Sequence, residues 1–241
     1  MAAGGCTDMP RPSGDPQQYA LKTARKTTVI KSLMQQNPGA FRQQLEQHGA
    51  LLADIAAQSI LHGLQSHRPI AIRTERCPPL LRADGASFVT LKHANGRLRG
   101  CIGSYQAHKP LAIDLAENAC KAAFKDPRFA PCTADALAGL DLSLSLLSPL
   151  QLMNVQNESG ILAALQPGRH GLAIQAGGKR AIFLPIVWRE LPEPRMFLDH
   201  LKAKAGLPTN RMIVPLRAWL FTTQLVNAPK AFARRLKAQA A

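Results

Sequence analysis

The sequence predicts an α+β fold in which a mixed, largely antiparallel sheet is flanked by helices. Helical and strand-like patterns intermix along the 241 residues without the regular strand–helix–strand alternation of a parallel sheet. Two pairs of strand-like segments are joined by Asn95-Gly96 and by Gly177-Gly178, turn sequences that are typical of antiparallel hairpins. The length allows one large domain or two small ones.

The first half of the chain is predicted to hold two helices and one hairpin. Apolar residues at helical spacing predict an amphipathic helix over 50–66. Alternating residues over 87–93 predict a strand, which the Asn-Gly turn joins to a second strand over 98–103. Pro110 suits the first turn of a helix that runs through about Lys125, where an Asp-Pro pair ends it.

The second half of the chain also mixes strand-like and helical patterns. Leucines that alternate with polar residues predict a half-buried strand over 140–146 with Ser143 and Ser145 on its polar face. The other predicted elements are a short helix over 134–139 capped by Thr133, a short helix over 158–165, a hairpin over 171–184, a helix over 193–205 ended by Gly206, and strand-like segments over 212–214 and 216–226 around Pro215.

The formal net charge of +15 at pH 7 suggests attraction to anions. Phosphorylated or carboxylated metabolites, RNA and an acidic partner protein all fit this charge. A nucleic-acid site usually interleaves aromatic with basic residues, and aromatic residues make up only 5% of the chain. The charge therefore favours an anionic ligand without selecting nucleic acid.

The sequence predicts a cytoplasmic protein. No apolar run reaches the roughly 18 residues needed to span a bilayer, and the first residues lack the order of a secretory signal. The five cysteines show no Cys-x-x-Cys spacing, so we expect neither a disulfide framework nor a zinc site. No membrane partner, metal or cofactor is expected for this chain.

Six short motifs occur in the order of a known family. They are Leu98–Gly103, Pro110-Leu111, Asp126–Phe129, Ser145–Pro149, Gly168–Leu172 and Leu184-Pro185. With these motifs the chain resembles the AMMECR domain family, which includes protein A of the AmmeMemoRadiSam system. The resemblance implies a larger α/β part, a smaller α+β part packed on it, and a cleft between them. It also implies a Memo-like protein and a radical SAM protein as partners, which would supply metal and radical chemistry.

The resemblance divides the chain into three parts. Residues 1–48 are an N-terminal extension that is partly disordered, because its first 20 residues are rich in Gly, Pro, Ser and Asp. Residues 49–226 form the AMMECR-like domain, and residues 227–241 form a basic C-terminal tail. The basic, Gln-rich stretch over 19–45 is a short helix pair, a partner-binding arm or flexible sequence.

Cys101 is the candidate catalytic residue. The thiolate is the reactive form of cysteine, and nearby guanidinium groups favour it. Arg99 is two residues away and so lies on the same face of the strand, and the resemblance implies that Arg128 lies beside this hairpin. Two arginines would also bind an anionic group of a substrate. Gly100 and Gly103, on either side of the thiol, let a ligand or another backbone approach closely.

Three further residues complete the candidate site. His170, between glycines in a predicted exposed turn, is the candidate general base or acid, with His108 as the alternative. Asp126 either orients an arginine or a histidine through a charge-assisted hydrogen bond, or makes local turn bonds at a helix end. Ser145 either lines the cleft or faces solvent on its strand.

Two functions of different classes fit these residues. The first is an enzyme that acts on a small anionic metabolite, with Cys101 as covalent nucleophile or acid/base and Arg99 and Arg128 as an anion clamp. The second is a non-catalytic binding module, whose cleft holds a ligand or peptide and whose basic tail holds RNA or an acidic protein. In the second, Cys101 is a small residue that fits a tight hairpin and Arg128 belongs to a structural ion pair.

Overall fold

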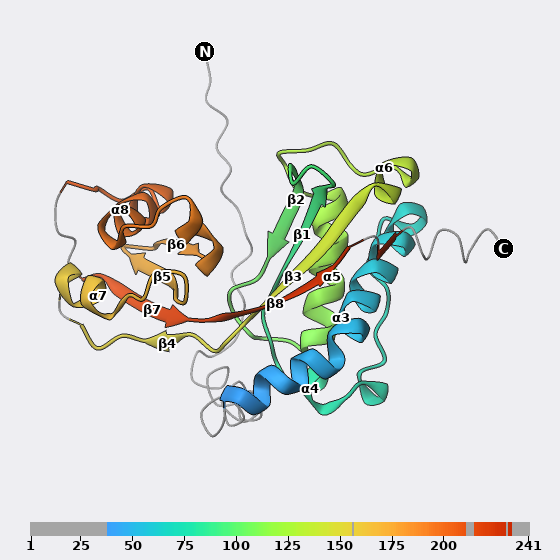
Figure 1. Ribbon diagram of the computed structural model, residues 1–241, viewed down its shortest axis with the longest axis horizontal. Helices are drawn as coiled ribbons and strands as arrows, with labels where there is room; N and C mark the ends of the chain where they lie inside the picture. Colours follow the sequence, from blue (N-terminus) through green and yellow to red (C-terminus); the bar gives the residue numbers. More distant parts are fainter. Residues whose placement is uncertain (1–37, 156, 211–214, 230, 233–241) are drawn as a thin grey trace, which may run out of the picture.

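The computed structural model describes residues 38–155, 157–210, 215–229 and 231–232. These residues form two units, each built around a four-stranded sheet (Figure 1). The predicted α+β class is confirmed, and the strand pairs in the described residues are antiparallel. The predicted extension up to residue 37, the predicted strand over 212–214 and the tail from residue 233 lie outside the described residues.

The larger unit has its sheet in the order β2-β1-β3-β8. The bounds are Ser87–His93 for β1, Leu98–Gly103 for β2, Leu140–Leu147 for β3 and Thr223–Ala228 for β8. Helices α3 (Pro38–Ser66) and α5 (Leu111–Phe124) pack on one face of this sheet (Figure 1). Because strand side chains alternate, the fully buried Val89 and Leu91 point to these helices, and Phe88 and Thr90 point to the helix-free face.

Three short elements complete the larger unit. They are η1 (Thr74–Arg76), α4 (Pro79–Arg82) and α6 (Ala134–Ala138). The hydroxyl oxygen of Thr133 accepts a bond from the N–H of Ala136 at 3.4 Å, which confirms the predicted cap of α6. The helix predicted over 50–66 is longer than expected, because α3 begins at Pro38, a residue suited to a helix start.

The smaller unit has its sheet in the order β4-β7-β5-β6. The bounds are Gln151–Leu152 for β4, Gly171–Ala176 for β5, Lys179–Phe183 for β6 and Arg217–Phe221 for β7, with helices α7 (Glu158–Ala164), η2 (Pro185–Arg189) and α8 (Pro194–Lys204). Its core centres on Phe197, whose ring stacks on Trp188 with centroids 3.8 Å apart and meets Phe183 edge-on at 5.2 Å.

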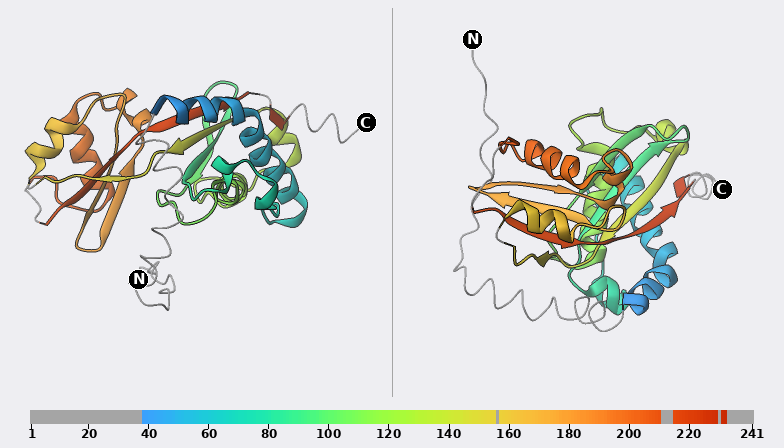
Figure 2. Two further views of the ribbon diagram at one scale, coloured as in Figure 1. Left: turned by 90° about the horizontal axis from the view of Figure 1, so that it is seen from below. Right: turned by 60° about the vertical axis from the view of Figure 1, so that its left-hand side comes forward.

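Two adjacent segments connect the units, as both views of Figure 2 show. The chain passes from β3 to β4 through Ser148 and returns from β7 to β8 through Thr222. These two residues bond each other twice through the Ser148 N–H and the Thr222 N–H, each at 2.9 Å. The strand predicted over 216–226 is therefore two strands in two different sheets, a division that no proline or glycine marks in the sequence.

No helix in the described part of the chain is both long and apolar enough to cross a membrane. One surface hollow lies between the middle of α3 and strand β8, and Gly49, Ala53 and Val226 are among the residues that line it. This hollow is separate from the hairpin that carries Cys101. The predicted cleft between the units stays a prediction.

Candidate functional site

The β1–β2 hairpin positions Cys101. Its turn places Gly96 at φ +83°, and residue 101 on β2 stands opposite Thr90 on β1. The half-buried sulfur of Cys101 lies 3.3 Å from Oγ1 of Thr90, on the helix-free face of the sheet. Along the same register, Ser143 of β3 and Asn227 of β8 continue this row. The thiol therefore ends a row of small polar side chains that crosses four strands.

The two glycines beside the thiol are explained by close packing. A Cβ at Gly100 would collide with the backbone carbonyl oxygen of Ala122 in α5. A Cβ at Gly103 would collide with the ring of Phe88. Gly100 thus admits another backbone, as the sequence allowed, and Gly103 admits an aromatic side chain.

Asp126 and Arg128 form hydrogen bonds with the backbone of Cys101 on β2, the edge strand of the larger sheet. The Cys101 N–H donates to Oδ2 of Asp126 at 2.8 Å, and Nη2 of Arg128 donates to the Cys101 carbonyl oxygen at 3.2 Å. Nε and Nη2 of Arg128 also donate to the two carboxylate oxygens of Asp126 at 2.9 and 2.7 Å. A bidentate ion pair therefore takes the place that a neighbouring strand would fill on this edge strand.

The two partners of this ion pair differ in their exposure to solvent. The side chain of Asp126 is 2% exposed, whereas that of Arg128 is 53% exposed. Hydrogen bonds from Arg128, supported by the Cys101 N–H, hold the pKa of Asp126 well below its ordinary value, although burial acts in the opposite direction. The carboxylate is thus fixed in its charged form, and the guanidinium keeps one side open to solvent.

Arg99 lies near the same loop but faces elsewhere. Its Nη2 donates to the carbonyl oxygen of Ala130 at 2.7 Å, and its buried Nη1 has no hydrogen-bond partner among the described residues. The ring centre of Phe129 lies 5.7 Å from the guanidinium of Arg99 and 5.5 Å from that of Arg128. The two arginines expected to clamp one anion therefore bond different backbone carbonyl oxygens, Arg99 that of Ala130 and Arg128 that of Cys101.

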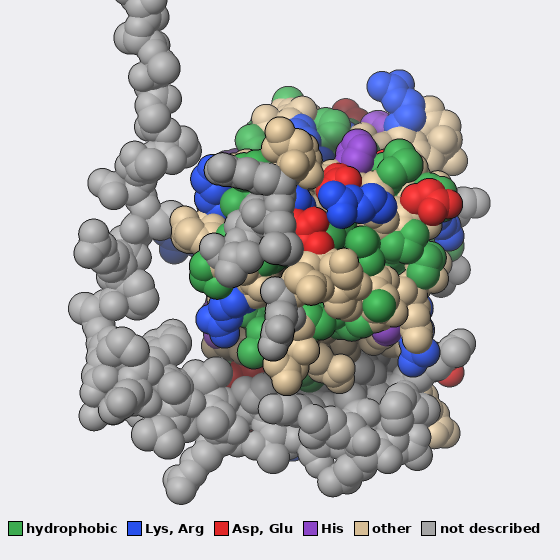
Figure 3. Space-filling view, turned by 90° about the vertical axis from the view of Figure 1, so that its left-hand side faces the viewer, with side chains coloured by type: hydrophobic (Ala, Val, Ile, Leu, Met, Phe, Trp, Pro, Cys, Tyr) green, Lys and Arg blue, Asp and Glu red, His purple; other side chains and the backbone are tan. Residues whose placement is uncertain are grey.

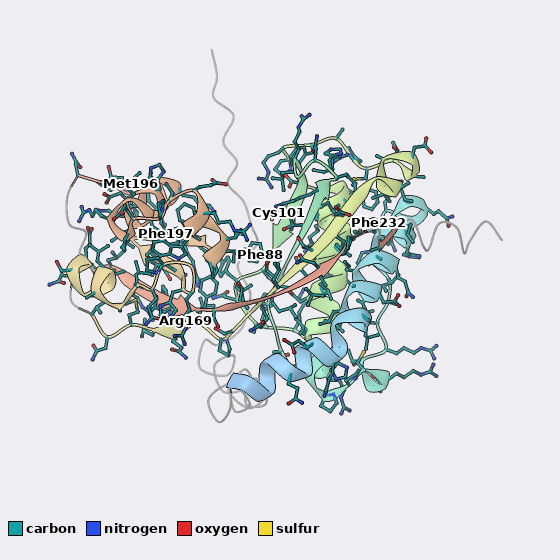
Figure 4. The ribbon with its side chains drawn as sticks, in the orientation of Figure 1. Phe88, Cys101, Arg169, Met196, Phe197 and Phe232 are labelled. Carbon is teal, nitrogen blue, oxygen red and sulfur yellow. The ribbon has the colours of Figure 1, made fainter. Side chains whose placement is uncertain are left out.

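His170 belongs to the smaller unit, at the entry of β5. Its carbonyl oxygen accepts a bond from Nε1 of Trp188 at 2.7 Å. Burial lowers the pKa of His170, and a hydrogen bond with the backbone of Ala164 opposes this effect. Figure 4 shows its neighbour Arg169 well apart from Cys101. The structure does not bring His170 into contact with the thiol.

Ser145 stands one row away from the thiol. It pairs with Phe88 on β1 and with Leu225 on β8, and it is half-buried on the helix-free face. His108 is exposed in the loop between β2 and α5. Of the candidate residues, the structure brings together Cys101, Asp126 and Arg128.

One cation near the thiol is absent from the sequence prediction. Lys204, the last residue of α8, donates from Nζ to the carbonyl oxygen of Ile182 at 3.0 Å and lies over the ring of Phe183 at 5.1 Å. Although its side chain reaches solvent, surrounding protein atoms desolvate the ammonium group and lower the pKa of Lys204. The charge of Cys101 opposes this shift and that of Arg128 adds to it, so both residues are electrostatic neighbours of Lys204.

A buried polar network below the hairpin is also missing from the sequence prediction. Oδ2 of Asp114 in α5 accepts from the N–H and the hydroxyl of Ser87 at 2.8 and 2.7 Å, and from Nδ2 of Asn118 at 3.0 Å. Ser104 donates to the other carboxylate oxygen. Burial raises the pKa of Asp114 despite these bonds. The network thus fixes Ser87, at the start of β1, and Ser104, just after β2, to α5. Its signal in the sequence is an Asp and an Asn at spacing i, i+4 within an apolar helix face.

The fold and the hairpin define an α+β protein with two antiparallel sheets and a cysteine hairpin held by a buried aspartate that pairs with a half-exposed arginine. The family model of AMMECR1 matches residues 53–226, and the chain belongs to the AMMECR1 family. This membership confirms the resemblance recognised from the motifs.

Relatives of known sequence and structure agree with this membership. Protein MK0488 of Methanopyrus kandleri is 34% identical over 171 residues, covering 67% of this chain and 79% of that protein. A protein of Methanothermobacter thermautotrophicus is 32% identical over 181 residues, covering 74% and 93%. The crystal structure of the uncharacterized protein PH0010 from Pyrococcus horikoshii superposes with a TM-score of 0.67 at 28% identity, covering 73% of this chain and 89% of that one.

Proposed function

We propose that this protein is an enzyme that acts on a small anionic metabolite and uses Cys101 as its reactive thiol. The observation that carries the proposal is the ion pair of Asp126 and Arg128 on the Cys101 backbone. It fixes the residue from the free edge of the sheet, and the sulfur stays half-buried on the helix-free face beside a cation.

The residues take distinct parts in this proposal. The Cys101 thiol gives its proton to water, and the thiolate adds to an electrophilic carbonyl carbon of the metabolite, so that the C=O π bond opens and its electron pair moves to the carbonyl oxygen, which takes a proton from water. The hydroxyl of Thr90 orients the sulfur at 3.3 Å, and Arg128 attracts the anion. Asp126 is a positioning residue because it acts through Arg128 and the Cys101 N–H.

The resemblance also supports a proposal about partners. A Memo-like protein and a radical SAM protein would supply metal and radical chemistry, and this chain would carry out one step between them. The proposal predicts that the three proteins consume or form a common metabolite.

A search for a covalent adduct tests the proposal. The protein is incubated with a panel of small carboxylated and phosphorylated metabolites, and the Cys101 peptide and the metabolites are followed by mass spectrometry. We expect one metabolite to be consumed, or to form an adduct on Cys101, with the native protein and with Cys77→Ser but not with Cys101→Ser. Cys77 is a matched control because it is also half-buried. Equal turnover by Cys101→Ser would contradict the proposal.

A non-catalytic binding module is the second candidate. It is supported by the contact between the Cys101 sulfur and Thr90 Oγ1, which gives the thiol a structural partner. A binding module predicts that Cys101→Ser retains the ligand and that the ligand is recovered unchanged. The same incubation therefore separates the two functions.

A further inference from the structure

We propose that Lys204 and Arg128, one from each unit, form an anion-binding site beside Cys101 for a carboxylate or phosphate group of a small ligand. The inference rests on the proposed function, because the bound anion is part of the molecule that meets the thiol. In this site Lys204, from the smaller unit, takes the part that the sequence suggested for Arg99, because Arg99 bonds to the carbonyl oxygen of Ala130.

The packing between the units brings Lys204 to the hairpin. Its Nζ is held by the carbonyl oxygen of Ile182, and Ile182 packs in the hydrophobic cluster that joins the two units. Phe88 belongs to the same cluster, and its ring covers Gly103, two residues after Cys101. Figure 4 shows Phe88 and Cys101 on the side of the larger unit that faces the smaller one.

A second contact across the junction fixes this arrangement. The guanidinium of Arg180 in β6 lies 4.2 Å from the ring centre of Tyr105, in the loop that follows β2. Strand β6 carries both Arg180 and Ile182, whose carbonyl oxygen accepts the bond from Lys204. These two contacts set the position of Ile182 relative to the hairpin, and the bond from Nζ ties Lys204 to Ile182.

The two cations keep unused donors. Arg128 directs Nε and Nη2 to Asp126 and to the Cys101 carbonyl, which leaves Nη1 for a ligand. Lys204 gives one bond to a backbone oxygen, and within the described residues no acidic side chain pairs with it. Desolvation and the charge of Arg128 both disfavour the Lys204 ammonium, and a bound anion would oppose both effects.

The surroundings of other cations in the smaller unit differ from this arrangement. At the far end of that unit basic and acidic side chains lie next to one another (Figure 3), and Arg195 pairs with both Glu158 and Asp199. Those charges neutralise each other, whereas Asp126 bonds to Arg128 and, within the described residues, no acidic side chain pairs with Lys204.

Alkylation by reagents of different charge tests the site. Iodoacetate is an anion and iodoacetamide is neutral, and both react with the thiolate, so the ratio of their rates at Cys101 reports the local potential and cancels the thiolate fraction. We expect Lys204→Met to lower the iodoacetate-to-iodoacetamide ratio by about threefold or more, the size expected for one partly screened charge nearby.

The controls use residues of the same type. Lys179→Met removes another lysine of the smaller unit that also donates to a backbone carbonyl oxygen, that of Gly206, and should leave the ratio unchanged. Lys204→Arg should restore the ratio, because it keeps the charge. A ratio that is equal in the native protein, Lys204→Met and Lys179→Met overturns the proposed site.

Protection by simple anions identifies the ligand class. At constant ionic strength, inorganic phosphate and succinate are added separately to the native protein during labelling with iodoacetamide. Slower labelling of Cys101 with either anion, lost in Lys204→Met and kept in Lys179→Met, supports the site and shows whether phosphate or carboxylate is preferred. Protection by neither overturns it. Iodoacetamide labelling that is slower at Cys101 than at Cys77 would instead contradict the proposed function. The iodoacetate-to-iodoacetamide ratio does not depend on that rate, so it still tests the role of Lys204.

Discussion

Each unit of the molecule has a buried carboxylate that pairs with a basic side chain, and the two pairs differ in whether the basic partner is buried as well. In the smaller unit Lys202 is fully buried, and its Nζ bonds Oε1 of Glu158 at 2.7 Å. In the larger unit Asp126 is buried, and Arg128 is half exposed. A pair with both partners buried ties α8 to α7, whereas a buried anion paired with a half-exposed cation leaves that cation available for a ligand.

The largest expected effect is on the buried lysine. Lys202→Ala leaves Glu158 buried with only the 3.5 Å contact to Arg195, so we expect a loss of about 3 kcal/mol or more in the free energy of unfolding. Urea unfolding measures it. Replacing both partners with apolar residues, Lys202→Met with Glu158→Leu, should recover much of the loss. A single variant as stable as the native protein would show that the pair is not structural.

The next largest loss of stability is expected at Gly100, in the hairpin of the larger unit. Gly100→Ala forces a methyl group against the carbonyl oxygen of Ala122, and we expect a destabilisation of about 2–3 kcal/mol. Gly139→Ala is the control, because its added Cβ meets open space and its φ is −96°. Similar unfolding midpoints for the two variants would contradict the tight packing of β2 on α5.

Asp126→Asn tests the carboxylate that accepts the bond from the Cys101 N–H. We expect a loss of about 1–2 kcal/mol at pH 7, because the charged hydrogen bonds to Arg128 and the Cys101 N–H weaken. The folded-state pKa of Asp126 lies below its unfolded value of about 3.9, so this stability is present above that value and is lost as the pH falls through the folded-state pKa.

The pH dependence sharpens that prediction. The difference in unfolding free energy between the native protein and Asp126→Asn should be constant from pH 7 to about 5 and should shrink below about pH 4. A difference that stays constant down to pH 3 would mean that the carboxylate is not the source of the stability.

Thr90→Val is expected to have the smallest effect on stability, less than about 1 kcal/mol, because it removes one weak contact at nearly constant volume. Labelling of Cys101 by iodoacetamide should slow by roughly twofold or more, since a hydroxyl that donates to the thiolate is lost. Ser145→Ala, one row away on the same face, is the control. Unchanged labelling of Thr90→Val would remove Thr90 from the site.

Local sequence patterns predicted most individual elements. The alternating leucines of β3, the Gly177-Gly178 hairpin and the end of α8 at Gly206, which has φ +67°, all agree with the structure. The division of β7 from β8 was missed because Thr222 has no breaking residue beside it. That division depends on the hydrogen bonds between Thr222 and Ser148, 74 residues earlier.

The sequence predicted only part of the candidate site, because local motifs reveal some of its residues whereas packing between distant segments positions the others. Asp126 and Arg128 share a short motif, and the structure brings them to Cys101. Lys204 was not foreseen, because a lysine in the last turn of a helix has an ordinary explanation in the helix dipole. Only the packing of the smaller unit through Ile182 reveals its neighbours.

The most direct test of the central claim is the rate of iodoacetamide labelling at each cysteine as the pH is varied, read by peptide mass spectrometry. Burial raises the pKa of Cys77, Cys120 and Cys132, which makes them internal references in the same sample. We expect Cys101 to react faster than each of these three reference cysteines across the pH range. If Cys101 reacts no faster than Cys77 across the pH range, the hairpin is structural and the proposed enzyme function is contradicted.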